Sequence, residues 1–199
     1  MSRFVFLFDL DSTLTKQEIL PTISKELGIY EKMSQLTEST MRGEIPFKQS
    51  FLQRVELLKE VPVSEVNRMI GDIRLNELLV EFIKKNKERC YVVTGNLDVW
   101  IKDLMKKIGI EDNLFSSKAL VKDDYIQDIF SIVDKNAVIS QMVLPFVAVG
   151  DGNNDAEMIE EAEIGIGYGG VREIAPSVLA CASHAIYDEK KLVEFLERL

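Results

Sequence analysis

The sequence predicts an α/β fold, a doubly wound parallel sheet with a small helical cap inserted after the first strand. Short apolar runs of strand length recur along the chain and alternate with amphipathic segments of helical length, as in sheets that are covered on both faces. Residues 15–72 break this alternation, because they hold helical patterns and no convincing strand. We therefore expect a catalytic core from residues 1–14 and 73–199 and a helical cap from residues 15–72.

Four apolar runs are predicted to form the parallel sheet. Each is too short for a helix, and consecutive apolar positions are typical of strands buried on both faces. The runs lie at residues 4–8, 90–93, 145–149 and 164–166. Alternating polar and apolar residues on both sides of the sequence KDDY predict a β-hairpin within residues 114–133.

Amphipathic segments are predicted to form the helices between these strands. Residues 98–110 place apolar side chains on one stripe and end near Gly109, and residues 155–165 repeat the pattern. Within the predicted cap, the amphipathic segments are residues 17–28, 46–60 and 62–72. The last two begin with a proline, which is favoured at the start of a helix.

The composition argues against several classes of function. A formal net charge of -9 over 199 residues does not attract nucleic acid or an anionic membrane surface. No apolar stretch is long enough to span a bilayer, and the N-terminus lacks the pattern of a signal peptide. Cys90 and Cys181 form no metal-type cluster, and His184 is the single histidine. We expect a cytoplasmic protein with free thiols and without a histidine-based triad or zinc site.

Three predicted strands end in residues that can carry chemistry. These residues are Asp9 and Asp11, then Thr94, Gly95 and Asn96, and finally Asp151, Asn154 and Asp155. Ligands bind at the carboxyl ends of the strands in an open parallel sheet, so we expect these groups to converge. Converging carboxylates repel one another, and a hard divalent cation relieves the repulsion. Oxygen ligands favour Mg²⁺, held by Asp9 and Asp151, by the backbone carbonyl of Asp11, and with Asp155 nearby.

A phosphate beside this metal would need further positive charge. Lys135 opens a predicted helix just ahead of the strand that ends in Asp151, and we expect its ammonium group to reach the site. The Thr94 hydroxyl and the Gly95 amide would donate hydrogen bonds to phosphoryl oxygens. An isolated lysine is more often a solvated surface residue, so this prediction depends on its place in the chain.

These residues together resemble the four motifs of the haloacid dehalogenase superfamily of phosphatases. The sequences DLDSTLT, VVTGN and GDGNND, with Lys135 between the last two, are similar to those motifs in order and residue type. The segment GEIPFKQSFLQRVELLKEVP resembles the cap of phosphoserine phosphatases, and Glu18 has the spacing seen in them. The resemblance covers nearly the whole chain and implies a Mg²⁺-dependent phosphomonoester hydrolase.

The resemblance implies a role for each core residue. Asp9 would be the nucleophile and form an aspartyl-phosphate. Asp11 would protonate the leaving oxygen and then activate water. Thr94 would hold the transferring phosphoryl group, Lys135 would neutralise charge, and the Asp151 motif would hold Mg²⁺.

The resemblance also implies a substrate, L-phosphoserine, hydrolysed to L-serine and phosphate in serine biosynthesis. Glu18 would receive the substrate ammonium group and Arg54 the substrate carboxylate. The other expected substrate contacts are Met41, Phe47, Thr94, Gly95, Asn96 and Asn154.

Alternatives to phosphoserine stay open because the chain departs from the family's usual pattern at Thr94 and Asn96 and in a shortened segment before Lys135. Phosphoserine phosphatases usually have Ser-Gly-Gly where this chain has Thr94-Gly95-Asn96, so Asn96 replaces a small residue beside the substrate. Phosphothreonine or a phospho-amino alcohol are alternative substrates. A receiver module that accepts phosphate and an inactive binding protein are alternative functions, but the GDGNND motif and the filled catalytic positions disfavour them. The expected partner is a small phosphomonoester, bound by a monomer or a homodimer.

Overall fold

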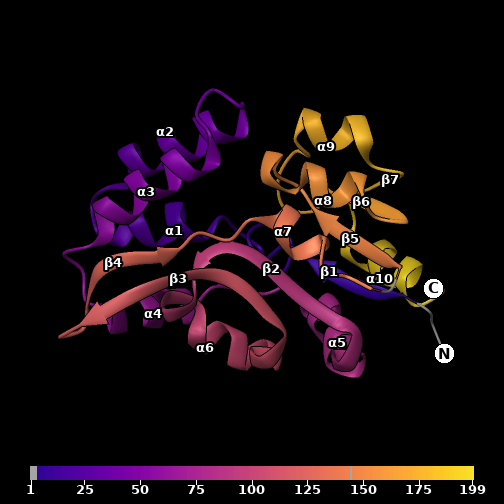
Figure 1. Ribbon diagram of the computed structural model, residues 1–199, viewed down its shortest axis with the longest axis horizontal. Coiled ribbons are helices and arrows are strands. Elements are labelled where there is room, and N and C mark those ends of the chain that lie inside the picture. Colours follow the sequence, from indigo (N-terminus) through magenta and orange to yellow (C-terminus); the bar gives the residue numbers. More distant parts are fainter. Residues whose placement is uncertain (1–3, 144) are drawn as a thin grey trace.

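A seven-stranded sheet with helices on both faces forms the centre of the molecule in the computed structural model, which describes residues 4–143 and 145–199 (Figure 1). The strand order is β4-β3-β2-β1-β5-β6-β7, and only the β3–β4 hairpin is antiparallel. The strands are β1 (Val5–Phe8), β2 (Cys90–Leu97), β3 (Leu114–Lys122), β4 (Tyr125–Ser131), β5 (Phe146–Gly150), β6 (Ile164–Tyr168) and β7 (His184–Ile186). The predicted doubly wound α/β fold and the predicted hairpin are confirmed; residues 1–3 of the predicted core lie outside the described residues.

The two faces of the central strand β1 belong to two different apolar clusters. Successive side chains of a strand point to opposite faces, so Phe6 and Phe8 lie in one cluster and Val5 and Leu7 in the other. The first cluster includes residues of α5 (Glu77–Lys85), α6 (Asp98–Ile108) and α10 (Glu189–Leu196). The second includes residues of α7 (Lys135–Ile139), α8 (Ala156–Glu160) and α9 (Pro176–Cys181). The core is therefore covered on both sides, as the continuous apolar strands require.

Four helices lie between β1 and α5 in the chain. They are α1 (Ile19–Glu26), α2 (Tyr30–Met41), α3 (Phe47–Leu58) and α4 (Val63–Gly71). Figure 1 shows α1, α2 and α3 grouped to one side of the strands, while α4 lies beside α6. The helix α2 was not among the expected segments, because only Met33, Thr37 and Thr40 are buried on it and its apolar stripe is thin.

The two segments that connect these helices to the core run side by side. The Lys16 amide donates to the Arg74 carbonyl at 2.8 Å, and the Asn76 amide donates to the Leu14 carbonyl at 2.8 Å. An isolated antiparallel bridge joins Thr15 to residue 75 between them. Both ends of the predicted cap segment are thus held at one place.

Several local features differ from expectation or add to it. The strand β2 continues past its predicted end at residue 93, and its pairing with β3 becomes irregular between Thr94 and Leu97. The strand β7 and the helices α9 and α10 were not predicted. Helix α6 ends at Gly109, whose positive φ of 80° suits glycine, as expected.

Cys90 and Cys181 are free thiols. Among the described residues, we find no helix that combines the length and apolar character needed to cross a membrane.

Candidate active site

Three buried carboxylates meet at the carboxyl ends of β1 and β5. Asp9 follows β1 and Asp151 follows β5, and one oxygen each of Asp9, Asp151 and Asp155 lies within 4.8 Å of the others. Asp155 returns to the cluster because its Oδ2 accepts from the backbone amides of Asp151 (3.0 Å) and Gly152 (2.8 Å). Gly150 leaves room for this turn, since a Cβ there would lie 2.6 Å from Asp155 Cγ.

Lys135 inserts its ammonium group into the carboxylate cluster. Its Nζ lies 2.6 Å from Asp9 Oδ1 and 2.5 Å from Asp155 Oδ1. The helix α7 that carries it is capped by Asp134, whose side chain accepts from the Asn136 amide at 3.0 Å. Burial alone would lower the pKa of Lys135, but the negative charges of Asp155 and Asp9 raise it, so the group stays charged.

Lys135 and Arg172 together do not balance the negative charge of the cluster, because Arg172 contacts Asp151 but also pairs with Glu18. Burial and the charge of Asp155 raise the pKa of Asp9 to about 7, although Lys135 opposes this. Burial and the charges of the neighbouring carboxylates raise the pKa of Asp151 well above its ordinary value. The donors are all oxygen atoms, and His184, the single histidine, is exposed on β7. An oxygen cluster that keeps an excess of negative charge fits a hard divalent cation such as Mg²⁺.

The side chain of Asp11 lies apart from this cluster. Its Oδ1 accepts from the backbone amide of Ile19 at the start of α1, at 2.9 Å. Burial raises the pKa of Asp11, against the opposing effects of the Ile19 hydrogen bond and the positive charges of Arg172 and Arg54. Two carboxylates separated by one residue thus have different surroundings: Asp9 faces the cluster, and Asp11 faces the inserted helices.

A small cavity of about 60 Å³ lies between the inserted helices and the core. All the residues predicted to contact the substrate line it, together with Asp9, Asp11 and Asp155: they are Glu18, Met41, Phe47, Arg54, Thr94, Gly95, Asn96 and Asn154. Phe47 packs directly on Gly95, where any Cβ would overlap the phenyl ring. The structure therefore brings together the residues that the sequence separates by more than a hundred positions.

Two polar groups in the cavity wall keep unused hydrogen-bonding capacity. Arg54 is buried, its Nε donates to the Ser50 carbonyl at 3.4 Å, and its guanidinium group lies 5.8 Å from the centre of the Phe47 ring. Within the described residues, Arg54 makes no ion pair with a carboxylate. Asn96 Oδ1 is also buried and has no hydrogen-bond partner in the described part of the chain.

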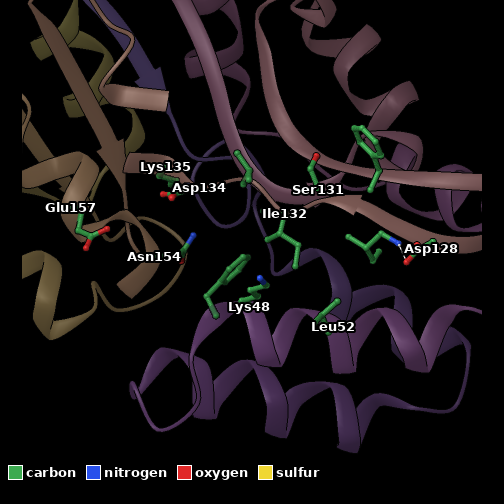
Figure 2. A pocket seen from close by; sticks show the side chains of 14 residues that line it. Lys48, Leu52, Asp128, Ser131, Ile132, Asp134, Lys135, Asn154 and Glu157 are labelled. Atoms are coloured by element: carbon green, nitrogen blue, oxygen red, sulfur yellow. Dashed lines mark hydrogen bonds between the residues drawn. The ribbon is translucent and has the colours of Figure 1, made fainter. Parts of the chain in front are cut away.

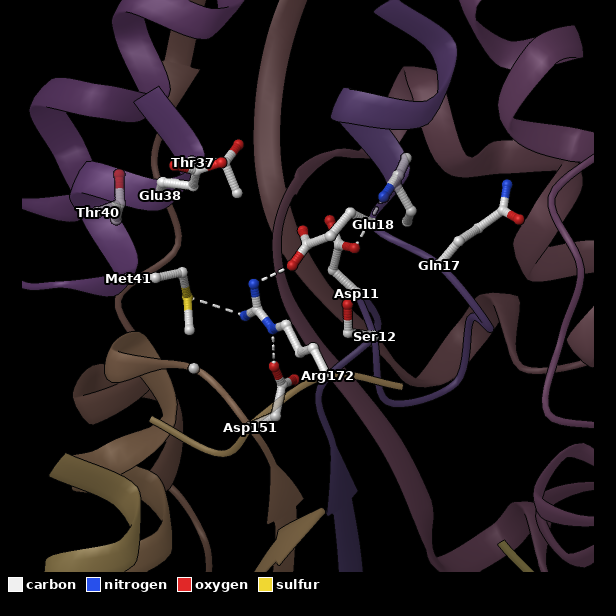
Figure 3. Close-up of polar contacts among 12 residues, drawn as sticks. Asp11, Ser12, Gln17, Glu18, Thr37, Glu38, Thr40, Met41, Asp151 and Arg172 are labelled. Atoms are coloured by element: carbon white, nitrogen blue, oxygen red, sulfur yellow. Dashed lines mark hydrogen bonds and ion pairs between the residues drawn. The ribbon is translucent and has the colours of Figure 1, made fainter. Parts of the chain in front are cut away.

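Arg172 is a residue of the cavity wall that sequence reasoning missed (Figure 3). It lies in the irregular segment between β6 and α9. Its guanidinium group donates to the carboxylates of Glu18 and Asp151, and its third nitrogen lies 2.9 Å from the sulfur of Met41. No motif or periodicity surrounds it, so only the three-dimensional fold shows that it reaches the site.

A larger cavity of about 730 Å³ adjoins the small one. It lies between α3 and the β3–β4 hairpin, and Figure 2 shows Lys48 and Leu52 of α3 on one side and Ile132 on the other. Phe47 and Asn154 line both cavities. Phe47 is therefore part of the wall of both cavities.

Comparison with known proteins identifies the family. The model of the haloacid dehalogenase-like hydrolases matches residues 6–160. The phosphoserine phosphatase of Methanocaldococcus jannaschii is 35% identical over 179 residues, which are 82% of this chain and 84% of the relative. The phosphoserine phosphatase of Lactococcus lactis is 27% identical over 98% of this chain and 95% of its own.

Solved structures give the same result. A phospho-aspartyl intermediate analogue of phosphoserine phosphatase superposes with a TM-score of 0.79 and 29% identity, covering 98% of this chain and 99% of the other. A hydrolase of the haloacid dehalogenase family from Salmonella enterica superposes with a TM-score of 0.82 and 25% identity, covering 100% of this chain and 73% of the other.

Proposed function

The chain belongs to the haloacid dehalogenase-like hydrolases, and from this premise we propose that it is a Mg²⁺-dependent phosphatase for a small phosphomonoester, L-phosphoserine. The observation that carries the proposal is the buried cluster of Asp9, Asp151 and Asp155, joined by Lys135 and placed at the wall of a small cavity. The products would be L-serine and phosphate, as in serine biosynthesis. The names of the relatives support this choice of substrate.

The first chemical step would transfer the phosphoryl group to Asp9. A carboxylate oxygen of Asp9 attacks phosphorus, the bond from phosphorus to the serine oxygen breaks, and an aspartyl-phosphate forms. Asp11, whose pKa is raised by burial, donates its proton to the leaving oxygen. Lys135 favours the ionised form of Asp9 and offsets the charge of the phosphate. Thr94 and Gly95 would donate hydrogen bonds to the phosphoryl oxygens.

The second step would return the enzyme to its starting state. Asp11, now ionised, accepts a proton from a water molecule, and the water oxygen attacks phosphorus and releases Asp9. When bound, Mg²⁺ supplies charge that offsets the phosphate and the carboxylates. Asp9, Asp151 and the backbone carbonyl of Asp11 would hold it, and Asp155 would contact the ion directly or through one of its ligands.

The inserted helices would supply the substrate specificity. We propose that residues 15–72 form a cap that closes over the substrate on the core formed by residues 1–14 and 73–199. Arg54 suits the substrate carboxylate because its buried guanidinium group makes no ion pair among the described residues, and a guanidinium group can bind a carboxylate in a bidentate manner. Glu18 would face the ammonium group. The walls would be formed by Met41, Phe47, Asn96 and Asn154.

A second candidate substrate class follows from Asn96. Its buried amide adds a polar group to the cavity, with Oδ1 left without a partner in the described part of the chain. A different small phosphomonoester, such as phosphothreonine or a phospho-amino alcohol, would use the same chemistry. The catalytic residues are common to both candidates, so the choice depends on the cavity alone.

The chemistry is tested by phosphate release from a panel of phosphomonoesters with and without Mg²⁺. We expect Asp9→Asn to abolish Mg²⁺-dependent release while circular dichroism shows an intact fold, because the amide is no nucleophile. Full activity of this variant would contradict the assignment of Asp9.

The cap contact is tested by Arg54→Ala. We expect kcat/KM for phosphoserine to fall about 10- to 100-fold, since a charge-assisted hydrogen bond contributes roughly 1.5–3 kcal/mol. Phosphoethanolamine has no carboxylate and serves as the matched substrate: its turnover should change much less. An equal loss for both substrates would show that Arg54 does not bind the carboxylate.

A further inference from the structure

The carboxylate of Glu18 already has a positive partner within the protein. Arg172 donates to it from one guanidinium nitrogen, and about a quarter of each side chain is exposed. In the proposed phosphatase, Glu18 is the group that would receive the ammonium of the substrate. Figure 3 shows the Arg172 guanidinium between Glu18 and Asp151, directly beside Asp11.

Arg172 is held in this place by contacts to both parts of the molecule. Asp151, whose side chain is only 1% exposed, accepts from Nε, and Met41 of α2 contacts another nitrogen. The segment that carries Arg172 is attached to the core by the Ala175 amide, which donates to the Asp151 carbonyl at 2.8 Å. An arginine fixed by three partners keeps its pairing with Glu18 at little further loss of side-chain entropy.

The pairing changes the charge that a substrate meets. A bare glutamate would attract an ammonium group and repel an anion, but a glutamate paired with arginine is close to neutral. Arg54 and Lys135 remain in or beside the cavity wall to attract a carboxylate and a phosphate. Asn96 adds an uncharged acceptor, and such an acceptor takes a hydrogen bond from a hydroxyl as readily as from an ammonium group.

We propose that Arg172 sets the substrate range of this site by supplying, within the protein, the positive charge that Glu18 would otherwise take from the substrate. The site then accepts short phosphorylated acids that carry a hydroxyl in place of the ammonium group, as well as phosphoserine. This inference rests on the proposed phosphatase function, because it concerns the same cavity. Arg172 acts through Glu18 and is a positioning residue.

The experiment compares two substrates that differ at this one group. O-phospho-L-serine carries an ammonium at carbon 2, and 3-phospho-L-glycerate carries a hydroxyl there in the same configuration. We measure kcat/KM for both with the whole chain at saturating Mg²⁺. For the wild type we expect the two values to agree within about tenfold. For Arg172→Ala, the ratio of phosphoserine to phosphoglycerate should rise about tenfold or more, because Glu18 is then unpaired.

Three further variants separate charge from structure. Arg172→Lys keeps the positive charge and should keep the ratio near that of the wild type. Arg172→Gln serves if the alanine variant is poorly folded, and should raise the ratio in the same way. Adding Glu18→Gln to Arg172→Ala should bring the ratio back down, because the unpaired carboxylate is then absent. A purely structural role of Arg172 would lower both values together and leave the ratio unchanged.

Measuring substrate binding without turnover tests the proposal independently of the kinetics. In an Asp9→Asn background, calorimetry gives the Kd of each phosphate ester, and the Kd ratio should change with Arg172→Ala as the kinetic ratio does. An unchanged ratio in both measurements, with phosphoserine still hydrolysed by the wild type, would overturn the inference alone. Release of phosphate from neither compound by the wild type would overturn the proposed function and the inference with it.

Discussion

At the scale of single residues, the contact between Phe47 and Gly95 joins the inserted helices to the core. Phe47 begins α3, and its ring covers the backbone of Gly95 at the irregular end of β2. The absence of a Cβ at Gly95 allows this approach, since its φ is not in the left-handed region. Glycine is therefore required at position 95 because a Cβ does not fit there, and not because the backbone needs a positive φ.

We expect Gly95→Ala to hold the helical insertion away from the core. The added methyl group would overlap the Phe47 ring, so the ring and α3 must shift. The KM for the substrate should rise about tenfold or more, and thermal stability should fall slightly. Steady-state kinetics and thermal unfolding measure both effects. If the overlap is the cause, adding Phe47→Ala should remove most of the Gly95→Ala effect; additive effects would show that it is not.

Single residues also show the limits of prediction from the sequence. Asp9 and Asp151 follow apolar strands, and burying a carboxylate there is unfavourable without a function, so the sequence alone predicts them. The sequence pattern alone would predict that Glu18 and Arg54 are solvated helix residues. Only the resemblance to a family singles them out. Arg172 follows β6 with no pattern around it, and its two acidic partners come from distant parts of the chain.

At the scale of elements, the paired connections between the core and the inserted helices are the place where a hinge would lie. Asn76 is buried there and its side chain donates to the Thr13 carbonyl at 2.7 Å, in addition to the backbone bonds of the two segments. A short polar bridge of this kind fixes the direction of both connections. The bridge is made to Thr13, two residues after Asp11, and so holds the segment that carries Asp11.

Removal of this bridge should weaken the connection. We expect Asn76→Ala to lower the free energy of unfolding by about 1–3 kcal/mol, because the Thr13 carbonyl is then buried without this donor. Urea-induced unfolding measures the change. The matched control is Gln141→Ala, which removes a similar bond to the Ala137 carbonyl (2.7 Å) at an exposed site and should cost less than about 1 kcal/mol. Equal losses in both variants would contradict a special role of Asn76.

The elements themselves differ in how well the sequence predicts them. The central strands are buried on both faces, so their apolar runs are uninterrupted and visible. The strand β7 lies at the edge of the sheet, and His184 and Ala185 are exposed, so it lacks such a run. Helix α2 buries few side chains for its length. Burial pattern, rather than chain position, decides which elements can be recognised.

At the scale of the whole molecule, the carboxylate cluster couples metal binding to folding. The chain has a formal net charge of -9. Burying three acidic groups beside Lys135 and an arginine shared with Glu18 adds local repulsion to this general excess. A ligand that binds only the folded state stabilises it in proportion to the logarithm of its concentration. A divalent cation at the cluster would therefore act on stability as well as on catalysis.

The sign of the pH dependence follows from Asp9. Its pKa is raised from 3.8 to about 7 in the folded protein, chiefly by burial and then by Asp155. Between about pH 4 and pH 7 the folded state therefore binds a proton that the unfolded state has lost. Without metal, stability should fall as the pH rises through this window. Mg²⁺ binds the ionised form, so its stabilising effect should grow over the same range.

We expect Mg²⁺ to raise the Tm by several degrees at pH 8 and by much less at pH 5. The test measures four Tm values by thermal unfolding, in excess EDTA and in excess Mg²⁺ at each of the two pH values. For a chain of this length, a change of about 1 kcal/mol in the free energy of unfolding shifts the Tm by roughly 2–4 °C. Asp9→Asn should reduce both the pH dependence without metal and the effect of Mg²⁺, whereas the exposed control Asp123→Asn should keep both. A Mg²⁺ effect of the same size at both pH values would show that ionisation of the buried cluster does not control metal binding, and the proposed metal ligands would have to be sought elsewhere.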